Sequence, residues 1–237
     1  MRISIVYTAV TNGPLTENYC ARFAATFREF PPGVECEIVV ACNGGPLPKS
    51  TSLIFSGMSA KMFPRVNDPS WDLGGYFDAA RGPCADADML LCLGESNYFH
   101  KEGWLKRLVD AWENHGPGMY GPFASNVVRA HLQTTAFCCS PTLLKQYPIR
   151  VCDKASRYAL EHGEQSLWRR TAARGMPVRL VTWDGDWEPR MWRKPPNILW
   201  RGDQSNCLWW SNHTDRYRDA DSKRKLNWAR SADRPFA

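Results

Sequence analysis

This sequence of 237 residues lacks the best-known signatures of several enzyme classes. It contains no GxGxxG and no GxxxxGK(S/T) loop, which weighs against dinucleotide oxidoreductases and P-loop enzymes. The GxSxG elbow and the HExxH pattern are also missing. Its apolar runs fall short of the ~18 residues that span a bilayer, so we expect no transmembrane segment. We also expect no signal peptide, because Thr-Asn-Gly follows the first apolar segment where a small-residue cleavage site would stand.

The sequence has no Cys-x-x-Cys pair among its nine cysteines. Several cysteines lie inside apolar runs, among them Cys36, Cys42 and Cys92. An odd number without metal-type spacing favours free buried thiols in a reducing compartment over disulfides or a zinc site. We therefore expect a cytoplasmic protein.

Positive charge is in excess, with a formal net charge of +6, and much of it lies between Arg190 and Arg234. A basic patch of this kind suits nucleic acid, anionic lipid or a phosphorylated substrate, and it equally suits a solvated surface. Since no nucleic-acid-binding motif accompanies it, we expect no nucleic-acid partner.

Strand-like and helix-like segments alternate in the first half of the chain. Apolar runs predict strands over 3–10, 35–41, 60–66 and 88–93. Apolar residues at helical spacing predict helices over 15–30, 72–80 and 101–114. This alternation predicts an α/β protein with a mostly parallel central sheet that is flanked by helices.

The second half of the chain is less regular. It predicts strands over 119–123, 134–139 and 177–183, and helices from Ser140 and over 154–174. Residues 187–203, which contain adjacent prolines, predict an ordered loop, and 214–237 predicts one surface helix. We divide the chain into a main domain, 1–190, and a C-terminal loop and helix extension, 191–237, that packs on it.

Polar residues follow two of the predicted strands where each strand ends. Asn43-Gly44-Gly45 comes after the second strand, and Glu95 comes after the apolar run from Met89 to Leu93. In open α/β sheets, ligands bind at the carboxyl ends of the strands. An Asn there can hydrogen-bond a base or a ribose, and a Glu can hold a divalent cation or a sugar hydroxyl. The alternatives are a plain Asn-Gly turn and a carboxylate that caps the next turn.

Three further acids lie where helices begin or continue. Asp72 opens a predicted helix, and Gly74 and Gly75 behind it let a ligand approach the backbone, although Asp72 equally suits a helix cap. Glu161 and Glu164 are candidates for a general base that removes a proton from an acceptor hydroxyl. His162 between them can substitute, because it titrates near neutrality. The alternative for both acids is a favourable contact with the helix dipole.

Aromatic residues are dense late in the chain. Trp187 and Trp192 stand among charged residues, so we expect them to be exposed and able to stack on an acceptor sugar. We expect Trp209 and Trp210 to be buried in the core, because they directly follow an apolar residue. His213 is either a structural histidine or a metal ligand.

The order of these elements resembles the GT-A glycosyltransferases, especially the family 2-like group. The opening strand, the Cys42-Asn43-Gly44 turn and a Gly-containing helix before an acid-bearing strand end follow that group's order. Gly163-Glu164 and the Leu and Arg behind it match the spacing of the group's Glu-Asp motif. The Asp-x-Asp motif of the group reads Gly94-Glu95-Ser96 here, so one carboxylate is left.

The resemblance implies a nucleotide-diphosphate sugar donor, a glycan or other hydroxyl acceptor, and inverting transfer with Glu164 as base. We add Glu161 as the reserve candidate for the base. The resemblance also implies that the donor phosphates lie against Glu95, directly or through Mn²⁺ or Mg²⁺, and we add His213 as a candidate metal ligand. The residues that we expect around the nucleotide sugar are Thr8, Ala9, Asn43, Asp72, Gly74 and Glu95. Since the acidic motif is reduced, arginines are alternative partners of the diphosphate, namely Arg81, Arg190, Arg193 and Arg201.

Other functions stay open at this point. A nucleotidyltransferase has a similar sheet, but it usually needs a basic residue in the loop after the first strand, which Thr11-Asn12-Gly13-Pro14 lacks. A carbohydrate-binding protein without enzyme activity would use the late tryptophans. A catalytically inactive member of the GT-A fold would explain the reduced acidic motif.

Overall fold

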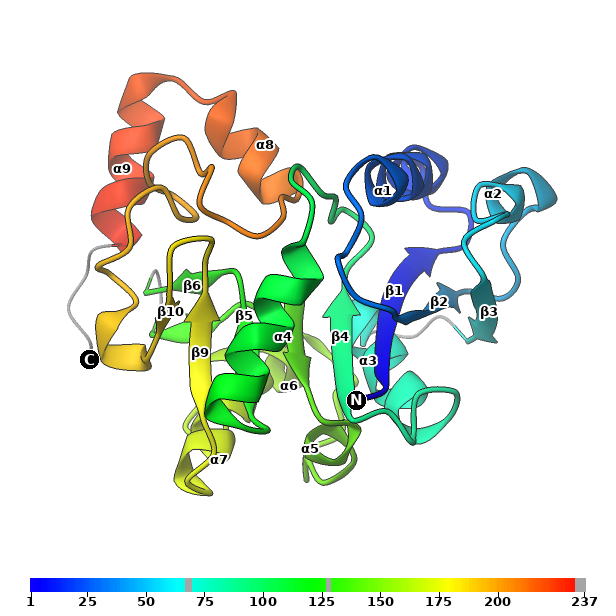
Figure 1. Ribbon diagram of the computed structural model, residues 1–237, viewed down its shortest axis with the longest axis horizontal. Coiled ribbons are helices and arrows are strands. Elements are labelled where there is room, and N and C mark those ends of the chain that lie inside the picture. The colour runs from blue at the N-terminus through cyan, green and yellow to red at the C-terminus, as the bar shows by residue number, and fades with distance from the viewer. Residues whose placement is uncertain (67–69, 127–128, 233–237) are drawn as a thin grey trace.

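The computed structural model describes residues 1–66, 70–126 and 129–232 of the chain (Figure 1). The strands are β1 (Ile3–Val10), β2 (Glu37–Asn43), β3 (Ala60–Arg65), β4 (Met89–Leu93), β5 (Met119–Gly121), β6 (Ala124–Ser125), β7 (His131–Leu132), β8 (Ala136–Cys139), β9 (Val178–Val181) and β10 (Asp186–Trp187). The helices are α1 (Thr16–Glu29), α2 (Lys49–Leu53), α3 (Trp71–Arg81), α4 (Trp104–His115), α5 (Pro141–Lys145), α6 (Lys154–His162), α7 (Leu167–Ala173), the 3₁₀ turn η1 (Pro189–Met191), α8 (Asn212–Arg218) and α9 (Ser222–Ala232).

One eight-stranded sheet runs through the molecule in the order β10-β9-β5-β8-β4-β1-β2-β3, and β6 pairs with β7 beside it. The neighbours β3, β2, β1 and β4 are parallel, whereas β8 is antiparallel to both β4 and β5. Helices cover the sheet (Figure 1). The predicted α/β class, with a mostly parallel sheet flanked by helices, is confirmed.

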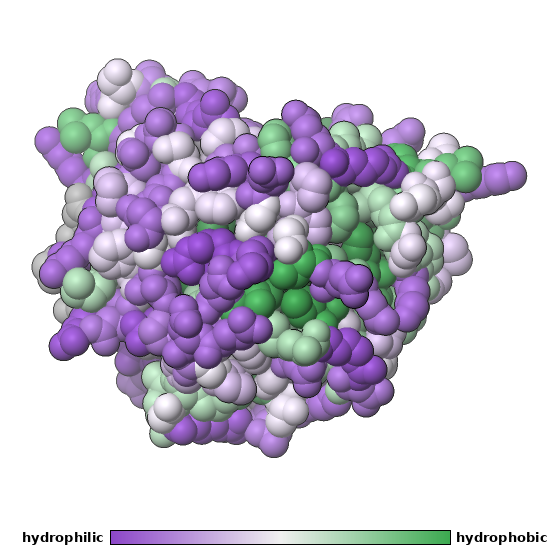
Figure 2. All heavy atoms as spheres, viewed as in Figure 1, coloured by the Kyte–Doolittle hydropathy of each residue, from purple (hydrophilic) through white to green (hydrophobic). Residues whose placement is uncertain are grey.

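The central strands are apolar throughout because both faces of the sheet are covered. In β1, Ile5 and Tyr7 pack with Phe23 of α1 on one face, and Val6 packs with Leu73 of α3 on the other. Successive side chains alternate between the faces, and each fully buried Val, Leu or Ile contributes about 1.5–3 kcal/mol. In Figure 2, a hydrophobic area is visible between α4 and α1 on an otherwise largely hydrophilic face.

Two predicted helices are each divided in the structure. The 154–174 helix is interrupted after α6 at Gly163, whose backbone is extended, with φ −67° and ψ 169°. A side chain there would clash, because a Cβ would lie 2.7 Å from the carbonyl oxygen of Ala159. The predicted single C-terminal helix is wrong in the same way, since α8 and α9 are separate and Asp221 accepts a hydrogen bond from the Arg224 amide at the start of α9. Residues 233–237 of that prediction lie outside the described residues.

The C-terminal segment packs closely on the rest of the chain. Trp209 is fully buried in the core, as its sequence context predicts, and Trp210 pairs with Tyr98 in an antiparallel bridge. The domain boundary at residue 190 stays a prediction. All nine cysteines are free thiols, and Cys152 is the exposed one. No helix among the described residues combines the length and apolar character that crossing a membrane requires.

Candidate functional site

Asp72 lies over the end of β1, and glycine makes this position possible. The Thr8 hydroxyl donates a hydrogen bond of 3.0 Å to Asp72 Oδ1. A Cβ on Gly75 would lie 2.8 Å from Thr8 Cγ2, so α3 can approach β1 this closely only with glycine there. On the β4 side, a Cβ on Gly94 would lie 2.8 Å from Asp72 Oδ2. The Asp72 carboxylate therefore sits between the carboxyl ends of β1 and β4.

Glu95 follows β4 and turns its carboxylate toward the end of β1. Its Oε2 accepts a hydrogen bond from the Val10 amide at 3.3 Å and lies 3.4 Å from the Thr16 hydroxyl, which donates at 2.6 Å to the Val10 carbonyl. Burial raises the pKa of Glu95, and the nearby charge of Asp72 adds to that rise. Burial also raises the pKa of Asp72, while the Thr8 hydroxyl and Arg157 oppose the rise. The two carboxyl groups form a desolvated acidic pair at the open edge of the parallel strands.

Glu161 lies near the C-terminal end of α6. Its pKa is lowered, in contrast to the raised pKa values of Asp72 and Glu95. Its Oε1 accepts hydrogen bonds from the amide of Thr134 at 2.9 Å and from its hydroxyl at 3.1 Å, and His162 Nε2 lies 3.3 Å from Oε2. Burial by itself would raise the pKa, but the His162 hydrogen bond, the neighbouring His131 and the Thr134 amide lower it to about 2. Glu161 is thus ionised at neutral pH.

The antiparallel strand β8 brings Glu161 to the same edge as the acidic pair. Thr135 lies directly before β8, and its carbonyl oxygen accepts hydrogen bonds from the Gly94 amide at 2.9 Å and from Asn97 Nδ2 at 3.0 Å. Its neighbour Thr134 binds Glu161. A short hydrogen-bonded path therefore joins the end of β4 to the Glu161 carboxylate.

Arg157 is a residue of this site that the sequence reading missed. It lowers the pKa of Asp72, and it adds to the lowering of the His213 pKa, of which burial is the main cause. Its guanidinium lies 5.6 Å from the ring centre of Trp71, which is 43% exposed. The signal was present in the sequence, because Arg157 precedes Glu161 by four residues and side chains at that spacing share a helix face.

Asn43 is fully buried, and its amide is engaged by the protein. Its Nδ2 donates to the Trp71 carbonyl at 3.3 Å, and its Oδ1 accepts from Arg65 at 2.9 Å. Trp71 has a φ of 50°, a left-handed conformation that bulky residues rarely adopt, and the Asn43 contact helps to hold it there. A groove of about 600 Å³ lies beside Asn43, lined by Gly44, Gly45, Pro64, Arg65 and Val66.

The other residues predicted from the sequence differ in burial, from the buried Ala9 to the exposed Glu164. Ala9 is fully buried in the core, and Gly74 packs against Arg65 and Ser70. Glu164 is exposed between α6 and α7. His213 lies in the first turn of α8, where the charge of Glu161 acts on its pKa.

The expectation that Trp192 is exposed is wrong. Its side chain is 2% exposed, its ring packs at 5.6 Å from that of Trp168, and its indole donates to the Trp187 carbonyl at 3.0 Å. Trp187 is partly buried, and its indole donates to the Thr182 hydroxyl at 3.0 Å. Charged neighbours in the sequence were a poor guide here, because an indole can place its N–H on a backbone carbonyl and bury its ring.

The carboxylates fit a divalent cation only in part. Among the described residues, the set of three candidate ligands that comes together is His131, Glu161 and His162, with atoms within 4.8 Å of one another, and Glu95 is not in it. Oε2 of Glu95 already contacts the Val10 amide and the Thr16 hydroxyl. A cation at Glu95 would take further ligands from substrate phosphates, as Mg²⁺ commonly does. The Mn²⁺ or Mg²⁺ cofactor stays a prediction.

No model of a known protein family matches the chain, and no curated protein matches it. Among solved structures, a cytidylyltransferase from Leptospira borgpetersenii is 14% identical, with 70% of this chain and 74% of that chain covered and a TM-score of 0.49. S. aureus TarS 1-349 is also 14% identical, with 73% and 55% covered and a TM-score of 0.49. HddC from Yersinia pseudotuberculosis is 12% identical, with 62% and 80% covered and a TM-score of 0.44. At these values the likenesses carry no argument about activity.

Proposed function

We propose that this protein is a nucleotide-sugar-dependent glycosyltransferase that moves a sugar to a hydroxyl acceptor. The observation that carries the proposal is the convergence of the Asp72–Glu95 pair and the ionised Glu161 at one edge of the sheet, joined through the Gly94–Thr135 hydrogen bond. Ligands of open α/β sheets bind at this edge. The acidic pair and Glu161 differ in protonation behaviour, which is how acids of one site take different roles.

The donor fits along β1, β2 and β4. The groove beside Gly44, Gly45 and Arg65 suits the base, since glycine backbone lets a flat ring approach closely. Asp72 is placed to accept from the ribose or sugar hydroxyls. Arg157, whose guanidinium makes no hydrogen bond within the described parts of the chain, is placed to neutralise the diphosphate, which makes it a better candidate than the arginines inferred from the sequence.

Glu161 is the better supported base. In the proposed step, the acceptor oxygen attacks the anomeric carbon while Glu161 takes the hydroxyl proton, and the bond to the phosphate oxygen breaks to release the nucleoside diphosphate. This single displacement inverts the anomeric centre. Glu161 is deprotonated and 15% exposed at the site, whereas Glu164, the first candidate from the sequence, is exposed in a turn.

A thermal-shift screen against UDP, GDP, dTDP and CMP, each with and without Mn²⁺, tests donor binding. A ligand at a hundredfold its dissociation constant adds about 2.7 kcal/mol of stability. Stabilisation by one nucleotide supports the proposal and names the donor class, and dependence on Mn²⁺ would support a cation at Glu95. If none stabilises the protein, carbohydrate binding without a nucleotide becomes the better hypothesis.

Product analysis separates the two transferase chemistries. A glycosyltransferase releases a nucleoside diphosphate from a nucleotide sugar. Release of pyrophosphate from a nucleoside triphosphate in the presence of a sugar phosphate would instead identify a nucleotidyltransferase and contradict the proposal.

A further inference from the structure

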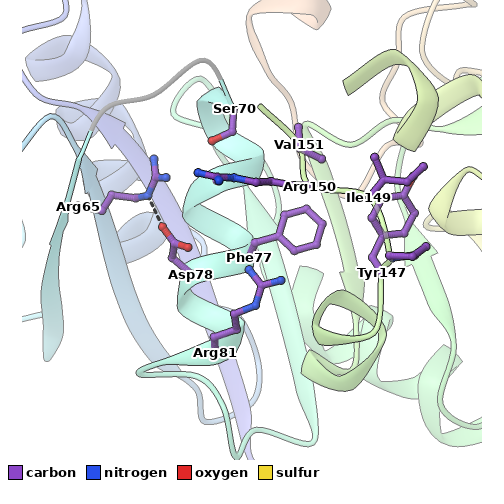
Figure 3. A pocket seen from close by; sticks show the side chains of 11 residues that line it. Arg65, Ser70, Phe77, Asp78, Arg81, Tyr147, Ile149, Arg150 and Val151 are labelled. Atoms are coloured by element: carbon purple, nitrogen blue, oxygen red, sulfur yellow. Dashed lines mark hydrogen bonds and ion pairs between the residues drawn. The ribbon is translucent and has the colours of Figure 1, made fainter. Parts of the chain in front are cut away.

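A second cavity, of about 300 Å³, lies between α3 and the segment 147–151. Figure 3 shows its lining residues, which come from the end of β3, from α3 and from that segment. None of the three site acids lines it. The lining residues are Arg65, Ser70, Gly74, Phe77, Asp78, Arg81, Tyr147, Pro148, Ile149, Arg150 and Val151.

Three guanidinium groups from three different parts of the chain line this cavity, against one carboxylate. The Arg65 side chain is 7% exposed, and its Nε donates to Asp78 Oδ2 at 2.8 Å, so the single carboxylate is already engaged. Arg150 extends from its segment toward Ser70 and Arg65, and Arg81 lies below Phe77, 5.5 Å from its ring centre (Figure 3). Arg81 and Arg150 have no carboxylate within ion-pair distance among the described residues.

The wall formed by α3 depends on glycine at position 74. A Cβ on Gly74 would lie 1.9 Å from the Ser70 hydroxyl oxygen and 2.5 Å from Arg65 Nη2. Glycine at this position therefore lets the buried Arg65 guanidinium and the Ser70 hydroxyl lie against the helix backbone. The opposite segment contributes the apolar side chains of Ile149 and Val151 beside Arg150 (Figure 3).

We propose that this cavity binds a small phosphomonoester, with the phosphate on Arg81 and Arg150 and the organic part against Phe77, Ile149 and Val151. Guanidinium groups match the geometry of phosphate oxygens and bind them through charge-assisted hydrogen bonds. Since the buried Arg65 is paired with Asp78, the uncompensated positive charge of the cavity lining comes from Arg81 and Arg150. A cavity of this size lies at the lower end of the range for small-molecule sites, which fits a ligand of few atoms.

Calorimetric titration of the full chain with phenyl phosphate and with inorganic phosphate tests the proposal. We expect phenyl phosphate to bind several-fold more tightly, because its ring buries apolar area against Phe77 and Ile149. R81Q and R150Q should each weaken it about tenfold or more, since each removes a charge-assisted hydrogen bond. Both arginines are exposed, and thermal unfolding checks that the variants stay folded.

Two controls make the result decisive. R230Q removes an exposed arginine from α9 and should leave phenyl phosphate binding unchanged, whereas equal loss in R230Q would mean that only net charge matters and would overturn the proposal. R157Q alters the strand-end site instead. Binding that is lost in R157Q but kept in R81Q and R150Q would place the phosphate at the strand ends and would also overturn it. Equal affinity for inorganic phosphate would overturn the assignment to an ester.

Discussion

The acids of the candidate site fall into two regions with opposite electrostatics. At the ends of β1 and β4, burial raises the pKa values of Asp72 and Glu95. At the end of α6, hydrogen bonds from His162 and Thr134 overcome burial and lower the pKa of Glu161 to about 2. Both regions are largely buried, so burial alone does not decide the protonation state. The hydrogen-bond donors and the imidazole groups that face each carboxylate decide it.

This difference in pKa suits two different roles in the proposed reaction, proton abstraction at Glu161 and ligand binding at Asp72 and Glu95. A carboxylate that is ionised at neutral pH can accept a proton at every turnover, although the donors that lower its pKa also make it a weaker base. A desolvated pair with few donors is destabilised when charged, so it gains when hydroxyl groups, a cation or Arg157 come to it with the substrate. The folded chain thus supplies the hydrogen-bond donors of Glu161 itself, whereas the partners that would stabilise charged Asp72 and Glu95 would come with the ligand.

The largest expected effect is on catalysis at Glu161. E161Q keeps the size of the side chain but cannot take a proton, so we expect the turnover rate to fall by about 10²- to 10⁴-fold. E164Q, a few residues away, should retain most of the activity. Steady-state kinetics with the donor identified by the thermal-shift screen measures both, and the reverse result would identify Glu164 as the base.

Glu161 should also stabilise the fold in a pH-dependent way. Its pKa falls from 4.5 to about 2 on folding, which corresponds to roughly 3 kcal/mol of stability above the unfolded pKa. That contribution is present at neutral pH and is lost as the pH falls from about 4.5 toward 2. Urea unfolding of the unmodified chain and E161Q should therefore differ most at neutral pH. A difference that does not shrink with acid would contradict the role of the donors.

Arg157 links the two regions and offers a third test. R157Q should weaken binding of the nucleoside diphosphate about tenfold, because it removes one charge-assisted contact to the phosphates. Nucleoside binding without phosphates should be much less affected. Calorimetry on both ligands measures the contrast, and equal losses would mean that Arg157 supports the fold and does not contact the diphosphate.

The smallest effect is expected at the acidic pair, where a substitution should raise the unfolding free energy, whereas E161Q should lower it. D72N keeps an oxygen that accepts from Thr8 but removes a charge that burial disfavours. We expect a gain of roughly 1 kcal/mol in unfolding free energy at neutral pH, together with weaker donor binding. Since the raised pKa costs stability only when Asp72 is ionised, the gain should disappear as the pH falls below the ordinary Asp value of 3.8. A destabilised D72N at neutral pH would show that the charge is compensated.

The central strands and their polar ends could be read from the sequence, because each is a local pattern. The run from Met89 to Leu93 is apolar throughout and forms a buried central strand, and Glu95 follows it at the sheet edge as expected. Trp192 could not be read in this way. Its burial depends on Trp168 and on a backbone carbonyl that the local sequence does not reveal.

The sequence alone determined the α/β class, the strands β1, β2 and β4, and the placement of Asn43 and Glu95 at the ends of β2 and β4, since hydrophobic periodicity and strand termination are local properties. Only the tertiary structure decided that β8 inserts antiparallel between β4 and β5 and so carries Thr134 and Thr135 to Gly94. That pairing is the reason why we propose Glu161 and not Glu164 as the base. Strand order and long-range hydrogen bonds join residues far apart in the chain, and no local periodicity encodes them.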